Sequence, residues 1–249
     1  MSAEPRPDPK RSPSAQGALV VDADPEQVRF FRENGYLAFE RITTDEEVAW
    51  LGERYDELFA NREAWFDVAQ PFGRGAEPRL GQMIFPELRA PELRETCFFA
   101  NARRIAARLL GLAPESLEAW GHMVLKPARN GHPTPWHQDE SYWQPGFDYQ
   151  ALGCWLPLED VDGENGCMCF LPGSHRGPLL PHRHLGGDPS VHLLELDVEV
   201  DVSGAAEVPL RIGGATFHHS RTLHATAGNR SDRPRRAFAN EFQTPPRRR

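Results

Sequence analysis

The sequence has no long apolar run, few cysteines and an excess of acidic over basic residues. No apolar stretch approaches the ~20 residues that a helix needs to cross a bilayer, so we expect no membrane partner. Residues 1–16 are rich in proline, serine and charge and have no apolar core, which argues against a secretory signal. We therefore expect a cytoplasmic protein. Its four cysteines fit reduced thiols in that compartment: Cys97, Cys154, Cys167 and Cys169.

The charge balance argues against a polyanionic partner. The 36 acidic residues exceed the 28 basic residues, and the formal net charge is −8. Binding to a nucleic acid requires a concentrated basic face. The short basic end, residues 245–249, is interpreted as a solvated tail. We therefore expect no nucleic-acid partner.

Length and composition are typical of one globular domain. The chain has 249 residues, of which 39% are hydrophobic and 26% charged, which is enough for one sizeable core. Residues 1–17 are polar, rich in proline and without apolar periodicity, so we predict a disordered leader there. Residues 18–249 are predicted to form a single domain, which acts as a monomer or a small homo-oligomer.

Capping residues and glycines predict helices in the first half of the chain. Asp24 can cap a helix that ends at Gly35, and Thr44 can cap a second helix. A third helix is predicted over residues 102–110, with Gly111 as its C-terminal stop.

From about residue 118 the pattern changes to short runs of β-branched, aromatic and sulfur-containing residues between turn residues. Strands are predicted over residues 120–125, 151–156, 167–171, 193–200, 208–212, 215–218 and 236–242. Helices followed by many short strands indicate an α+β, mainly β chain with a sandwich or a jelly roll.

The run Pro135-Trp136-His137-Gln138-Asp139 is the first candidate for chemistry. Alternate side chains of a strand point the same way, so His137 and Asp139 are expected to project from one face. Two histidines and one carboxylate on one side of Fe(II) leave coordination positions open. A histidine-x-aspartate pair alone is weak and is also compatible with a surface histidine near an acid, so a third ligand is needed.

The second candidate is the stretch from Phe217 to Arg235. It contains His224, a hydroxyl two residues later at Thr226, and an arginine eleven residues later at Arg235. A turn between two adjacent antiparallel strands would bring His224 and Arg235 into one cavity, where the guanidinium could hold a carboxylate through two hydrogen bonds. His218 and His219 could compete for the metal, but the spacing to Arg235 favours His224.

These blocks give the chain a resemblance to the phytanoyl-CoA dioxygenase family of iron and 2-oxoglutarate oxygenases. It covers roughly residues 26–243, and the blocks stand in the order and at the spacing typical of the family. The blocks that carry it are residues 136–139, 155–161, 164–175 and 224–235, together with the helical start at residues 31–36.

The resemblance implies a double-stranded β-helix, a jelly-roll (cupin-like) barrel with N-terminal helices packed on one sheet. It implies Fe(II) on His137, Asp139 and His224, with 2-oxoglutarate and O2 as co-substrates. Arg235 would bind the remote carboxylate of 2-oxoglutarate, assisted by Thr226. Three further residues match positions that can line the co-substrate pocket: Gln138, Trp155 and His122. Arg236 is expected to face away, unless the strand register slips by one residue.

The implied reaction is the oxidation of an unactivated C–H bond of a small-molecule metabolite, with release of succinate and CO2. Hydroxylation is the expected outcome. Oxidative cyclisation or desaturation of a natural-product scaffold, which could contain a sugar, would need the same residues. A metal-binding jelly roll that is not an oxygenase, such as an isomerase or a sensor, is the alternative of another class, and Arg235 argues against it. Candidate lids over the barrel mouth are residues 71–86, 140–149 and 176–192.

Overall fold

Two sheets that face each other dominate the computed structural model, which describes residues 11–13, 19–70 and 78–249. Every strand pairing is antiparallel, and the larger sheet has the order β1-β12-β7-β14-β4-β3-β2. Its strands are β1 (Tyr36–Phe39), β2 (Phe66–Asp67), β3 (Gly81–Ile84), β4 (Glu118–Lys126), β7 (Ala151–Pro157), β12 (Ala215–His219) and β14 (Arg235–Gln243). This mainly β arrangement confirms the predicted jelly-roll class.

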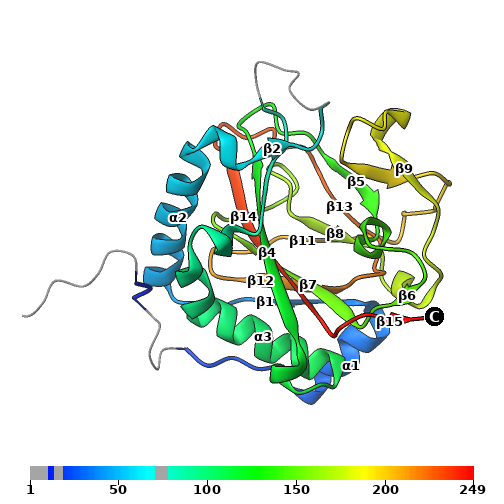
Figure 1. The fold of residues 1–249 in the computed structure, drawn as a ribbon, viewed down its shortest axis with the longest axis horizontal. Helices are drawn as coiled ribbons and strands as arrows, with labels where there is room; N and C mark the ends of the chain where they lie inside the picture. The colour runs from blue at the N-terminus through cyan, green and yellow to red at the C-terminus, as the bar shows by residue number, and fades with distance from the viewer. Residues whose placement is uncertain (1–10, 14–18, 71–77) are drawn as a thin grey trace, which may run out of the picture.

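The smaller sheet has the order β11-β8-β13-β5 and lies on the other side of the barrel from the helices (Figure 1). Its strands are β5 (Thr134–His137), β8 (Met168–Phe170), β11 (Ala206–Val208) and β13 (His224–Thr226). Two short ribbons complete the fold: β9 (His182–His184) with β10 (Leu194–Leu196), and β6 (Phe147–Asp148) with β15 (Arg247–Arg248).

Helix ends follow the local sequence. α1 (Pro25–Asn34) begins at Asp24, whose carboxylate accepts from the N–H groups of residues 26 and 27, and it ends at Gly35 in the left-handed region with φ +80°. A side chain on Gly35 would also collide with the side chains of His175 and Thr222, so glycine is required there. α2 (Asp45–Ala60) begins after Thr44, as predicted.

α3 (Cys97–Leu110) begins five residues before the predicted start. Thr96 is its N-cap and accepts from the N–H of Phe99, and Gly111 closes it with φ +70°. The prediction missed the start because the cap at Thr96 has no acidic residue three positions later to complete a capping box.

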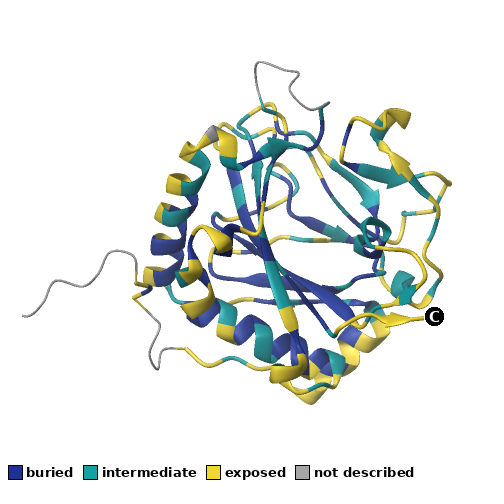
Figure 2. Cartoon of the chain, viewed as in Figure 1, coloured by how far each residue is buried: buried dark blue, intermediate teal, exposed yellow. Residues whose placement is uncertain are grey.

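The larger sheet separates two apolar layers. On its outer face, α2 and α3 pack their buried sides against β7 and β14 (Figures 1 and 2). Leu152 and Phe242 belong to this outer core, whereas Trp155 and Ala239 belong to an inner cluster with Phe170 of β8. The alternation along β7 and β14 therefore directs one set of side chains to the helices and the other set into the barrel.

The predicted leader lies almost wholly outside the described residues, except for residues 11–13, where the Ser12 hydroxyl donates to Glu47 at 2.5 Å. All four cysteines are free thiols. Among the described residues, no helix combines the length and the apolar character needed to cross a bilayer.

Candidate metal centre and co-substrate pocket

The space between the two sheets is a cavity of about 480 Å³. Three side chains with metal-binding atoms line it: His137, Asp139 and His224. β5 ends at His137, and Asp139 opens a short 3-10 helix, η5 (Asp139–Tyr142), so the prediction that one strand carries both residues was wrong at Asp139. Gln138 between them keeps an extended backbone with φ −121° and ψ 132°. Both side chains therefore still emerge on the same side.

The third candidate ligand comes from the neighbouring strand. His224 on β13 stands opposite His137 on β5, and their ring centroids are 4.2 Å apart. The Nε2 atoms of His137 and His224 lie 3.5 Å and 3.4 Å from the same oxygen, Oδ1 of Asp139. One ligand atom from each of the three residues lies within 4.8 Å of the others. This spacing fits a single ion bound by all three side chains.

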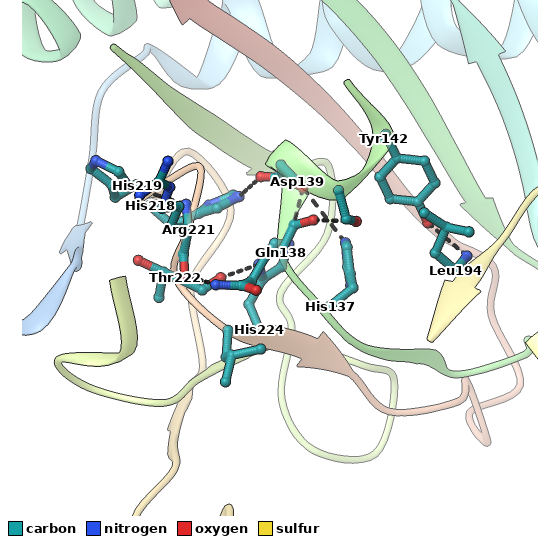
Figure 3. Close-up of polar contacts among 12 residues, drawn as sticks. His137, Gln138, Asp139, Tyr142, Leu194, His218, His219, Arg221, Thr222 and His224 are labelled. Carbon is teal, nitrogen blue, oxygen red and sulfur yellow. Dashed lines mark hydrogen bonds and ion pairs between the residues drawn. The ribbon is translucent and has the colours of Figure 1, made fainter. Parts of the chain in front are cut away.

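Backbone carbonyls fix the orientation of both imidazoles. Nδ1 of His137 lies 2.8 Å from the carbonyl oxygen of Pro135, and Nδ1 of His224 lies 2.9 Å from that of Thr222. Because a carbonyl only accepts, each Nδ1 carries the proton and donates, which leaves the lone pair of each Nε2 directed at Asp139 (Figure 3). Both histidines are thus in the tautomer that a metal ligand needs.

The ionisation of the site also suits a cation. Burial would raise the pKa of Asp139, but the surrounding imidazoles of His224, His137 and His218 hold it well below its usual value. Burial lowers the pKa of His224 well below its usual value, against the opposing pull of Asp139. An ionised carboxylate and neutral imidazoles are the forms that coordinate a metal.

His218 occupies the other side of Asp139. Its Nε2 lies 3.0 Å from Oδ2 of Asp139, whereas the two facing histidines approach Oδ1 (Figure 3). Nδ1 of His218 is buried and has no hydrogen-bond partner among the described residues. A neutral ring with its proton on Nε2 satisfies both facts, because a buried lone pair costs less than a buried unpaired N–H. His218 therefore positions Asp139 by donating a hydrogen bond to Oδ2.

Arg235 lies in the same cavity, and among the described residues no carboxylate forms an ion pair with it. It is 1% exposed, and its Nε and Nη1 atoms have no hydrogen-bond partner among the described residues. Its guanidinium lies over the Trp155 ring, with Cζ 5.4 Å from the centroid. The buried hydroxyl of Thr226 likewise has no partner in the described part of the chain. Buried polar groups are normally satisfied, so these atoms are suited to bind a carboxylate.

The route by which Arg235 reaches the cavity differs from the prediction. β13, which carries His224, belongs to the smaller sheet, and β14, which carries Arg235, belongs to the larger one. The two residues therefore face each other across the barrel and do not sit on adjacent strands. Arg236 points the other way, as expected, and pairs with Glu159 at 2.6 Å and Asp56 at 2.8 Å.

A second buried basic residue lies next to Arg235 but does not line the cavity. Lys126 on β4 stands opposite Arg235, and its Nζ donates to the carbonyl oxygen of Ala227 at 2.6 Å. Burial, and then the charge of Arg235, lowers the pKa of Lys126 well below its usual value. The pKa of Arg235 itself falls to about 10 through burial, so Arg235 stays charged at neutral pH and is the group available to an anion.

Of three further predicted pocket residues, two line the cavity and one does not. Trp155 and His122 line the cavity, and Nδ1 of His122 accepts from the Gln82 amide at 3.0 Å. Burial lowers the pKa of His122 to about 4, so its ring is neutral. Gln138 does not line the cavity: its amide donates to the carbonyls of Pro178 and Arg221, and its oxygen accepts from the N–H of Leu180. Strand alternation turns it away from its neighbours His137 and Asp139.

The sequence of the chain is similar to those of known proteins. The profile of the family described as Phytanoyl-CoA dioxygenase (PhyH) matches residues 31–237. The chain belongs to the phytanoyl-CoA dioxygenase family. A probable phytanoyl-CoA dioxygenase of Caenorhabditis elegans is 26% identical over 234 residues, which cover 87% of this chain and 74% of that protein.

Several solved structures resemble the chain over most of its length. EvdO2 from Micromonospora carbonacea var. aurantiaca is 41% identical, with a TM-score of 0.84 and coverage of 93% of this chain and 95% of that one. A second EvdO2 structure, complexed with 2-oxoglutarate, gives a TM-score of 0.82. SnoK, a non-heme alpha ketoglutarate dependent carbocyclase from nogalamycin biosynthesis, is 26% identical with a TM-score of 0.70, and the match covers 89% and 84% of the two chains.

This member of the phytanoyl-CoA dioxygenase family is therefore a 2-oxoglutarate-dependent dioxygenase, an oxidoreductase that uses Fe(II), 2-oxoglutarate and O2. The residues present fit that assignment. The two Nε2 lone pairs and Asp139 suit iron, and the unpaired Arg235 and Thr226 suit a distal carboxylate.

The rest of the cavity wall carries residues that the sequence did not single out. The predicted lid over residues 140–149 does supply Tyr142 and Trp143, and the lid over 176–192 supplies His192, while residues 71–77 lie outside the described residues. Trp120 and Glu241 were missed. Glu241 could have been found from the sequence, because it stands six residues after Arg235 and an even spacing on a strand returns to the same face.

Proposed function

We propose that the chain binds Fe(II) through His137, Asp139 and His224 and binds the distal carboxylate of 2-oxoglutarate through Arg235 and Thr226. The observation that carries this proposal is Arg235, a buried guanidinium with two unpaired nitrogens in the cavity that also holds the metal-binding cluster. An isomerase or a sensor that bound only a metal would leave this cation without an anion, which is costly in a buried site.

The reaction we propose is hydroxylation of an unactivated C–H bond of a small-molecule natural product. When bound, iron with 2-oxoglutarate and O2 supplies the oxidising power, and 2-oxoglutarate is released as succinate and CO2. The chain positions and shields the reaction: the imidazole donors fix the ligand geometry, and the aromatic walls at Tyr142, Trp143 and Trp155 exclude water. Similarity to SnoK, from nogalamycin biosynthesis, supports a natural-product substrate.

Oxidative cyclisation is the second candidate, because the SnoK carbocyclase shares the fold over most of this chain. The same residues would serve it. Product mass separates the two outcomes, because hydroxylation adds one oxygen atom and cyclisation removes two hydrogen atoms.

The cofactor part of the proposal can be tested without the substrate. Under anaerobic conditions, Fe(II) and 2-oxoglutarate together should give a visible charge-transfer absorption that neither gives alone. Under air, slow succinate release should accompany it and should increase when a compound panel includes a substrate. Absence of both signals would refute the assignment of this site.

The two neighbouring arginines provide a matched pair of variants. Arg235→Ala removes the unpaired guanidinium, so the affinity for 2-oxoglutarate should fall about 10- to 100-fold, the cost of charge-assisted hydrogen bonds. Arg236→Ala instead breaks the pairs with Glu159 and Asp56 outside the cavity, so 2-oxoglutarate affinity should stay unchanged. Titration of the charge-transfer absorption measures both. Reversed behaviour of the two variants would contradict the assignment of Arg235.

A further inference from the structure

Strand β14 places a guanidinium and a carboxyl group at opposite ends of the cavity. Residues 235, 237, 239 and 241 alternate onto its inner face, so Arg235 and Glu241 face the cavity with two alanines between them. Six strand residues correspond to about 20 Å, too far for Glu241 to be an ion-pair partner of Arg235. The small side chains of the two alanines leave space in the cavity between the guanidinium and the carboxyl group.

Glu241 differs from the other buried carboxylates of the molecule. Glu47 accepts four hydrogen bonds, Glu87 pairs with Arg94, and Glu140 pairs with Arg221. The Glu241 side chain is 6% exposed, and its Oε2 has no hydrogen-bond partner among the described residues. A buried carboxyl oxygen without a hydrogen-bond donor is unfavourable. A buried oxygen atom without a donor is typical of a side chain that binds a ligand.

A glycine on the neighbouring strand allows the Glu241 carboxyl to occupy its position. On β7 the opposite residue is Gly153, and a Cβ built there would lie 3.1 Å from Oε1 of Glu241 and 2.8 Å from Nε2 of His218. The absence of a side chain at Gly153 therefore lets Glu241 stand beside the imidazole that supports Asp139. The carboxyl thus lies at the metal end of the open space, close to where a substrate must be held.

An aromatic wall flanks the same position. Trp120 on β4 is the register partner of Glu241 on the other side of β14. Trp143, from the turn after η5, packs edge-on against Trp120 with ring centroids 6.2 Å apart and contacts Tyr149 at 4.9 Å. Both tryptophans line the cavity. Indole faces favour the apolar face of a ring or a cation.

We propose that Glu241 is the substrate-anchoring group and binds a hydrogen-bond-donating substituent, a hydroxyl or an ammonium, of a compound whose cyclic body packs against Trp120 and Trp143. This inference rests on the proposed function, because it assigns the substrate end of the same cavity. A carboxyl has acceptor oxygens for such a donor, and the indoles cover the ring that carries it. Glu241 would thereby select which C–H bond of the substrate faces the metal.

The test uses three probes with one carbon body, added to the full chain with Fe(II) and 2-oxoglutarate under anaerobic conditions. The probes are cyclohexylmethanol, cyclohexylmethylamine and cyclohexylmethyl methyl ether, and calorimetric titration measures their binding. At least one donor probe should bind up to about tenfold more tightly than the ether, as expected for one additional hydrogen bond. Glu241→Leu should abolish that advantage. Glu241→Gln should retain the binding advantage of the alcohol and lose that of the amine. The comparison therefore shows whether Glu241 binds a hydroxyl or an ammonium.

Glu118→Leu is the matched control. Glu118 lies on β4, two residues before Trp120, and is exposed. The Glu118→Leu variant should keep the wild-type preference. Equal binding of all probes, binding of none, or a donor preference that survives in Glu241→Leu would overturn the proposal. The charge-transfer absorption is read in every sample, so loss of the absorption in the wild type identifies failure of the proposed function instead. If only the leucine variant lacks the absorption, Glu241→Ala replaces it with the same expected result.

Discussion

At the scale of single residues, the two oxygens of Asp139 have different surroundings. Oδ1 faces the Nε2 atoms of His137 and His224, and Oδ2 receives the N–H of His218. A hydrogen bond to one oxygen favours coordination through the other, so His218 is expected to keep Asp139 a one-oxygen ligand. On this assignment, the three histidines near Asp139 would divide into two metal ligands and one residue that positions the carboxylate.

His218→Phe tests that division. The variant keeps a ring of similar shape on β12 but leaves Oδ2 of Asp139 without its donor. Residues that support metal ligands typically contribute 10- to 100-fold to affinity, so we expect Fe(II) affinity to fall by about that factor, with an altered charge-transfer absorption. His218→Gln, which retains an N–H donor, should restore part of the affinity.

The exposed His184 provides the control for this variant, since it lies on β9 outside the cavity lining. His184→Phe should bind Fe(II) as the wild type does. If His218→Phe also binds Fe(II) like the wild type, His218 has no supporting role, and if it binds none at all, His218 acts as a ligand.

At the scale of elements, a buried carboxylate joins two helices. Glu47 on α2 is fully buried and accepts from the backbone N–H groups of Cys97 and Phe98, both at 2.8 Å. These are the first N–H groups of α3, which no residue inside that helix can satisfy. The hydroxyls of Ser12 and Thr43 complete the set. An anion from one helix therefore caps the positive end of the next.

Glu47→Gln should destabilise the chain in a pH-dependent way. Burial would raise the pKa of Glu47, but the hydrogen bonds from Ser12, Thr43 and the start of α3 hold it below the ordinary value of 4.5. A pKa that is lower in the folded state adds stability above the unfolded pKa, and this is lost as pH falls through the folded pKa. Near neutral pH the variant should lose about 2 kcal/mol, a Tm decrease of about 4–8 °C for this chain length.

Thermal unfolding followed between neutral pH and about pH 3 measures this effect. The Tm difference between wild type and Glu47→Gln should be largest near neutral pH and should shrink below pH 4.5, where the wild-type carboxyl protonates. Glu46→Gln, at an exposed neighbouring position, should have no such effect. A difference that stays constant across the range would mean that the charge of Glu47 is not what stabilises α3.

Local signals in the sequence predicted those elements whose ends depend on neighbouring residues. Asp24, Gly35 and Gly111 fixed helix ends correctly because capping and positive φ are decided within a few residues. Short strands were less predictable. β1 and β3 have only four residues each and were missed, and the strand predicted over residues 208–212 shares only residue 208 with β11 (Ala206–Val208). Their positions depend on pairing partners that are distant in sequence, such as β12 for β1.

In the candidate site, too, local spacing was predictable from the sequence, whereas contacts between distant segments were not. The spacing from His224 to Thr226 and Arg235 was sufficient to predict which residues share the cavity, and all three line it. How they meet was not predictable, because it depends on β13 and β14 belonging to opposing sheets. The partners of Gln138 and the isolation of Glu241 also depend on packing between distant segments, which no spacing in the sequence specifies.

At the scale of the whole molecule, each sheet supplies one half of the site. His137 and His224 stand on the smaller sheet, and Arg235 stands on the larger one. A dicarboxylate held by the metal at one end and by Arg235 at the other would therefore connect the two sheets. Ligands that bind only the folded state stabilise it, by about 2.7 kcal/mol at a concentration 100 times Kd.

This arrangement predicts that Fe(II) and 2-oxoglutarate stabilise the protein cooperatively. Under anaerobic conditions, both together at saturation should raise Tm by about 5–10 °C, which exceeds the sum of the two separate increments. The 2-oxoglutarate increment should disappear in Arg235→Ala while the Fe(II) increment remains. 2-Oxopentanoate, which has the same chain length without the distal carboxylate, should give the wild type only a small increment. Equal increments from the two oxoacids would show that Arg235 does not hold the distal carboxylate and that the ligand does not join the sheets.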